Sequence, residues 1–117
     1  MQIVERVVGD LTILGLKGRL VAGDGDDAFV DALNRLVQLG RRKVLINLEE
    51  LTYLDSCGVG AIVSKYISLH KRGGQFKLCN LRTRSFRVLD LTKILTVIES
   101  FDSEADAIKS FQETPQA

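Results

Sequence analysis

The sequence predicts a single domain of the α/β (α+β) class, in which one mixed β-sheet carries four packed helices. The chain has 117 residues, 45% of them hydrophobic, which suits one buried core. Its first residues read as a β-hairpin, and strand and helix patterns then alternate, which is typical of helices that cross over between parallel strands. We expect the domain to span residues 1–112. Residues 113–117 contain the only proline and no apolar cluster, so we expect a frayed tail.

The hairpin prediction rests on two β-rich runs, residues 2–8 and 11–17, which flank the turn dipeptide Gly9-Asp10. A short extended piece, 19–22, follows, and the glycines and aspartates of 23–27 then favour a helix start. One apolar stripe predicts that helix, with Gly40 as its stop: Phe29, Ala32, Leu33, Leu36 and Val37.

The remaining elements follow from the same patterns. Residues 43–48 are almost unbroken apolar and branched, which favours a central parallel strand. A short loop should lead from this strand to a helix at 55–72, which Gly73-Gly74 would end. We expect the rest of the chain to form a strand at 75–79, a helix at 83–91, a strand at 95–98 and a helix at 102–111 that buries Ala105, Ile108 and Phe111.

Charge and composition exclude several classes of partner. Sixteen basic and fifteen acidic residues give a net charge of +1, too little to hold nucleic acid or anionic lipid. No apolar run approaches the ~18 residues of a membrane span, and the N-terminus does not resemble a signal peptide, so we expect a cytoplasmic protein without membrane insertion. The two cysteines, Cys57 and Cys79, are too few for a disulfide framework or a structural zinc site.

The candidate site is the segment 48–60, which runs from a strand end into a helix start. Asp55 is placed to cap the helix, and Ser56 would present its hydroxyl at the first helical position, within reach of a kinase. Gly58 and Gly60 would allow another backbone to approach closely. The spacing alone favours the simpler interpretation, in which Asp55 is an ordinary helix cap and the glycines only pack the helix against the sheet.

The spacing of residues in this segment argues against catalysis and against nucleotide binding. Cys57 and the only histidine, His70, are 13 positions apart, about 20 Å along one helix at 1.5 Å per residue. Ser56 lacks the G-x-S-x-G context because Leu54 occupies the first glycine position. Val63 stands where a dinucleotide fingerprint needs its third glycine. We therefore expect no enzyme activity, no catalytic residue, no cofactor and no metal.

The block 47–62 resembles the signature segment of the STAS family, specifically its bacterial anti-sigma factor antagonists, where the pattern reads Asp-Ser-(Ser/Thr)-Gly-(Leu/Val)-Gly. Here it reads Asp-Ser-Cys-Gly-Val-Gly. The resemblance extends to the opening hairpin, to Gly18-Arg19-Leu20, to Lys65-Tyr66 and to Gly73-Gly74.

The resemblance implies a phosphorylation switch at Ser56. In the family, an anti-sigma factor that is itself a serine kinase phosphorylates the serine after the aspartate, and the unphosphorylated antagonist binds this kinase and frees a sigma factor. A serine phosphatase is a further expected partner, and we expect a monomer. The residues expected to bind the partner are Arg19, Val21, Asp55, Ser56, Cys57, Gly58, Val59 and Gly60.

The chain departs from the family pattern at three positions. Arg19 and Val21 stand where relatives often carry acids, which bears on the choice of partner. Cys57 replaces a Ser or Thr and leaves the neighbouring Ser56 in place.

STAS domains also serve as scaffolds or accessory subunits of stress-signalling and transport complexes, so a scaffold that is not switched at Ser56 remains the alternative function.

Overall fold

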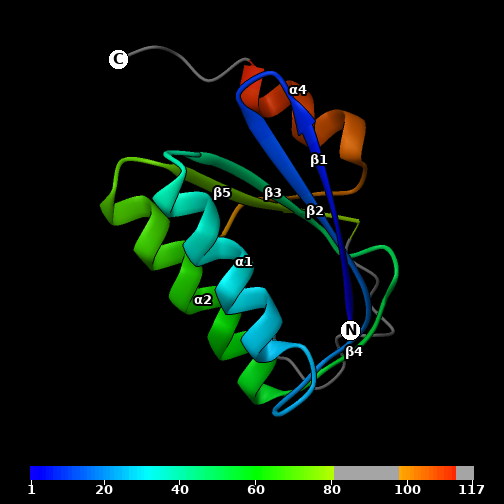
Figure 1. The fold of residues 1–117 in the computed structure, drawn as a ribbon. Helices are drawn as coiled ribbons and strands as arrows, with labels where there is room; N and C mark the ends of the chain where they lie inside the picture. Colours follow the sequence, from blue (N-terminus) through cyan, green and yellow to red (C-terminus); the bar gives the residue numbers. More distant parts are fainter. Residues whose placement is uncertain (81–97, 113–117) are drawn as a thin grey trace.

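The computed structural model describes residues 1–80 and 98–112 (Figure 1). These residues form one mixed sheet with helices on both faces, which confirms the predicted fold class. The strands are β1 (Gln2–Val8), β2 (Leu11–Leu20), β3 (Lys43–Asn47), β4 (Leu51–Leu54), β5 (Gln75–Cys79) and β6 (Ser100–Phe101). The helices of the described residues are α1 (Asp26–Gln38), α2 (Ser56–Lys71) and α4 (Glu104–Gln112).

The sheet has the strand order β1-β2-β3-β5-β6. β1 and β2 pair antiparallel across the turn at Gly9, which has φ +62°, so the predicted hairpin is confirmed. β2 with β3, β3 with β5 and β5 with β6 all pair parallel. The connections that contain α1 and α2 return the chain to the end of the sheet at which the preceding strand begins.

β4 is a strand that the sequence analysis described as a loop. It leaves the main path of the sheet and pairs parallel with the last residues of β2, so that Arg19 is opposite Tyr53 and Leu20 is opposite Leu54. The register shifts between Gly18 and Arg19, and Gly18 has φ +100°, a conformation that favours glycine. The four residues of β4 are too few to show strand periodicity, which is why the sequence pattern did not predict this strand. Its pairing with β2 depends on the bend in β2.

The helices lie in two layers. α1 and α2 lie side by side on one face of the sheet and α4 lies on the other face (Figure 1). The larger core joins α1 and α2 to the sheet, and among its fully buried side chains are Leu14, Leu16, Phe29, Leu33, Val44, Ile46 and Phe76. The smaller core, under α4, contains Leu11, Ile13, Leu45, Cys79, Ala107 and Phe111.

Several predictions for the C-terminal third need correction. The described residues contain three helices, and the fourth, predicted at 83–91, lies outside the described residues, as does the tail 113–117. The last strand among the described residues is Ser100–Phe101. Most of the strand predicted at 95–98 lies outside the described residues, and Ile98, its last residue, lies in a bend. In α4, Ala107 is buried and Ala105 is exposed, because the helix is turned so that Ala107 and Phe111 face the sheet.

Among the described residues, no helix is both long enough and apolar enough to cross a membrane.

Candidate functional site

Ser56 is the first residue of α2 and is exposed. Asp55, which joins β4 to α2, has extended backbone geometry, and its Oδ1 accepts a hydrogen bond from the backbone N–H of Gly58 at 2.9 Å. This is the helix cap that the sequence predicts. Ser56 is therefore held at a helix start with its side chain open to solvent.

The second carboxylate oxygen of Asp55 reaches a different part of the chain. Its Oδ2 accepts a hydrogen bond from the backbone N–H of Ala22 at 3.0 Å, and the N–H of Asp55 faces the carbonyl oxygen of Leu20 at 3.4 Å. The hydrogen bonds from Ala22 and Gly58 hold the pKa of Asp55 below its ordinary value. Asp55 thus ties the loop after β2 to the start of α2.

The two glycines of the signature have different surroundings. A Cβ atom on Gly58 would overlap the carbonyl oxygen of Leu20 and the Cδ1 of Leu54, so only glycine lets α2 approach β2 this closely. A Cβ atom on Gly60 would meet nothing within 4 Å. Gly58 therefore serves packing inside the domain, whereas Gly60 leaves open space on the surface.

The eight predicted site residues come from two segments, the end of β2 with its following loop and the β4–α2 junction, and the structure brings the two together. Arg19, Ser56, Cys57 and Gly60 are exposed and Asp55 is half-buried. Three others are buried and leave little surface for a partner: Val21, Gly58 and Val59.

Acidic side chains gather at the same end of the molecule. α1 and α2 both begin here (Figure 1), and the loop before α1 carries Asp24, with Asp26 and Asp27 in the first turn of the helix. The N-terminal amine contacts Asp24 Oδ1 at 3.1 Å. Aspartates at a helix start are favoured by the partial positive charge of its free N–H groups.

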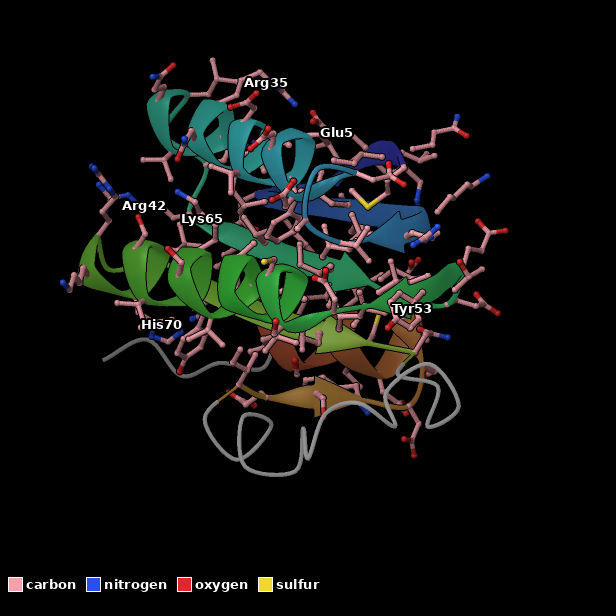
Figure 2. All side chains as sticks on the ribbon, turned by 90° about the horizontal axis from the view of Figure 1, so that it is seen from below. Glu5, Arg35, Arg42, Tyr53, Lys65 and His70 are labelled. Carbon is pink, nitrogen blue, oxygen red and sulfur yellow. The ribbon has the colours of Figure 1, made fainter. Side chains whose placement is uncertain are left out.

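Tyr53 is a surface residue of this site that the sequence analysis did not single out. It lies on β4 (Figure 2) and is 42% exposed. The guanidinium carbon of Arg19 lies 5.7 Å from its ring centroid. A tyrosine two positions before the capping aspartate is the only signal that the sequence itself offers, because the exposure of its ring is seen only in the structure. The pairing with Arg19 depends on the β2–β4 register.

The thiols and the histidine do not form a catalytic set. Cys57 and His70 lie in the first and last turns of α2, as the helix prediction required. Cys79 is buried in the smaller core, and burial raises its pKa to about 12. Within residues 1–80 and 98–112, no cluster of three or more His, Cys, Asp or Glu side chains is arranged to hold a metal ion.

The family assignment comes from comparison with known proteins. A model of the STAS domain matches residues 2–107. The chain belongs to the STAS domain family. The resemblance carried by residues 47–62 is therefore confirmed, and the match extends well beyond that segment.

Curated STAS relatives of this chain are named anti-sigma factor antagonists. The anti-sigma F factor antagonist of Paenibacillus polymyxa is 25% identical over 69 residues, 59% of this chain and 59% of the relative. The anti-sigma-B factor antagonist of Bacillus subtilis is 37% identical over 54 residues, 46% of this chain and 50% of the relative. The chain thus matches between half and three fifths of the length of these relatives.

Solved structures of STAS proteins share the fold over nearly the whole chain. An anti-sigma factor antagonist from Mycobacterium paratuberculosis matches with a TM-score of 0.79 at 16% identity. The match covers 96% of this chain and 94% of the chain of that protein. The anti-sigma factor antagonist SpoIIAA in its unphosphorylated form has a TM-score of 0.74 at 18% identity, with coverage of 96% and 99%. SpoIIAA has also been solved in a phosphorylated form, again with a TM-score of 0.74. At these identities the likeness shows the fold alone.

Proposed function

We propose that this chain is a cytoplasmic anti-sigma factor antagonist that is switched by phosphorylation of Ser56. In the unphosphorylated state it binds an anti-sigma factor serine kinase and thereby releases a sigma factor. Phosphorylation of Ser56 by that kinase blocks binding, and a serine phosphatase resets the switch. Membership of the STAS family and the names of the curated relatives support the antagonist part of this proposal.

The observation that carries the proposal is the placement of Ser56. Its hydroxyl is exposed at the first position of α2, directly after a capping aspartate that also fixes the neighbouring loop. A kinase can reach a hydroxyl in this position without unfolding any part of the core. The surrounding backbone is held in place by hydrogen bonds to Asp55, so the modified and unmodified surfaces differ mainly in charge.

Phosphorylation would change binding more than folding. A phosphate adds about −1.5 to −2 charges, and the start of a helix favours negative charge, so α2 should persist. At a docked interface, however, like charges brought together cost several kcal/mol. A loss of about 3 kcal/mol is roughly a hundredfold in affinity, which suffices for a switch.

The direct test is calorimetric titration of the purified kinase with Ser56 variants. Ser56→Ala should bind like the unmodified protein and resist phosphorylation. Ser56→Asp and the protein phosphorylated at Ser56 should bind roughly a hundredfold more weakly. The melting temperatures of Ser56→Ala and Ser56→Asp should lie within a few degrees of wild type. The kinase is obtained by affinity capture from the source cell, or from a gene adjacent to that of this chain.

Ser64 supplies a matched control, because it is a second exposed serine on α2, two turns further along the helix. Ser64→Asp should leave binding unchanged. Equal affinity of unmodified protein, Ser56→Asp and phosphoserine would refute the switch. It would favour the alternative function, a STAS scaffold or accessory subunit that is not regulated at Ser56.

A further inference from the structure

Arg19 is an exposed cation whose charge is unpaired within the described chain. Its guanidinium carbon lies 5.7 Å from the ring centroid of Tyr53, and no carboxylate among residues 1–80 and 98–112 pairs with it. By contrast, Lys17, which is near it on β2, has Glu50 at 3.4 Å. Among the described residues, the guanidinium of Arg19 therefore has no carboxylate partner, and its hydrogen-bond donors are available to a group on another protein.

Tyr53 holds this guanidinium in place. Arg19 and Tyr53 are register partners of β2 and β4, and the ring supplies a flat, electron-rich surface on which the cation rests. An arginine that rests over a ring loses less side-chain freedom on binding than an unsupported one, because its orientation is already restricted. Tyrosine and arginine are, with tryptophan, the residue types enriched at energetically important interface positions.

The pair lies beside the proposed switch. Leu54 and Asp55 separate Tyr53 from Ser56, and Asp55 itself bonds the loop that follows Arg19 and Leu20. A protein that covers Ser56 therefore meets Arg19 and Tyr53 in the same approach. This end also carries the exposed acids Asp24 and Asp27, and Asp24 is paired with the N-terminal amine, so the surface around Arg19 carries charges of both signs.

We propose that Arg19 and Tyr53 form a specificity-determining contact in which Arg19 pairs with a carboxylate of the partner kinase. The inference rests on the proposed function and names the chemistry of its partner. A planar guanidinium matches a carboxylate through two parallel hydrogen bonds, which a lysine cannot reproduce. The same partner carboxylate would be repelled by a phosphate on Ser56, so attraction at Arg19 and repulsion at Ser56 act on one acidic element.

The experiment is titration of the purified kinase with variants of this chain at low and physiological salt. Arg19→Glu should weaken binding roughly a hundredfold or more, and Arg19→Lys roughly tenfold. Tyr53→Phe should bind almost as tightly as wild type, because the ring face remains, whereas Tyr53→Ala should lose roughly tenfold. Melting curves check that each variant is folded.

Arg72→Glu is the matched control. It makes the same change of charge on an exposed arginine, but Arg72 follows the last turn of α2, at the far end of the helix from Ser56. It should bind within about twofold of wild type once its melting curve shows a folded protein. Replacement of exposed kinase carboxylates by lysine should then identify one position that restores binding to Arg19→Glu.

The outcomes separate this inference from the proposed function. If wild type binds the kinase and Ser56→Asp does not, but Arg19→Glu binds equally or more tightly, the Arg19 contact is refuted and the switch stands. If Ser56→Asp binds like wild type, the switch is refuted, whatever Arg19→Glu does. Equal losses in Arg19→Glu and Arg72→Glu would show a general charge effect and would also refute the specific contact.

Discussion

The Oδ2 atom of Asp55 accepts a hydrogen bond from the backbone N–H of Ala22 across 3.0 Å, although 33 residues separate the two in sequence. The other oxygen of the same carboxylate caps α2 through Gly58. One side chain therefore fixes both halves of the surface around Ser56. The proposed switch depends on this rigidity, because a fixed surface lets a single phosphate decide whether a partner fits.

Replacement of Asp55 should show both of its contacts. Asp55→Ala removes the helix cap and frees the N–H of Ala22, so we expect the melting temperature to fall by roughly 5 °C. Amide hydrogen exchange at Ala22 and Gly58 should accelerate in the variant, while exchange in the middle of β3 changes only with global stability. Unchanged exchange at Ala22 would contradict the tie between the loop and α2.

The lowered pKa of Asp55 predicts a specific dependence on pH. Hydrogen bonds from Ala22 and Gly58 favour the ionised carboxylate in the folded state, so the pKa of Asp55 is lower folded than unfolded. Its stabilising effect is complete above the unfolded value, about 3.9, and is lost as the pH falls through the lower folded value. The difference in melting temperature between wild type and Asp55→Asn should therefore shrink between pH 6 and pH 2.5. A constant difference would contradict this assignment.

The two signature glycines should respond to alanine with opposite signs. Gly58→Ala forces a Cβ atom into the Leu20 carbonyl and should destabilise the domain by about 2–3 kcal/mol. Gly60→Ala meets open space in the interior of α2 and should stabilise it by about 0.5–1 kcal/mol. Urea denaturation measures both. Similar changes in the two variants would show that their different surroundings have no energetic consequence.

The two cysteines should differ sharply in reactivity. Cys57 is exposed, whereas Cys79 is buried with its pKa raised to about 12, so it carries almost no thiolate at neutral pH. An aromatic disulfide reagent at pH 8 should label one thiol quickly and the second only in denaturant. Cys57→Ser should abolish the fast phase and, since Cys57 is expected to be only a small spacer, should preserve kinase binding and phosphorylation. Two fast thiols in the native protein would contradict the burial of Cys79.

Local patterns predicted much of the fold. The hairpin at Gly9-Asp10, the apolar stripe of α1 and the cap at Asp55 all depend on residues a few positions apart, and all three are confirmed. The strand Ser100–Phe101 was not predicted, and burial was predicted for Ala105 where Ala107 is the buried residue, because short C-terminal elements contain too few residues to show their boundaries.

The start of α2 and the position of Ser56 after its capping aspartate follow from the local sequence, since capping acts over three residues. The surroundings of this serine depend on contacts between distant parts of the chain. The bend at Gly18 pairs β2 with β4, and that pairing brings Ala22 to Asp55, Leu20 to Gly58 and Arg19 to Tyr53. These partners are more than 30 residues apart, and no local periodicity encodes them. They depend on how β2, β4 and α2 pack against one another, which is a property of the whole folded domain.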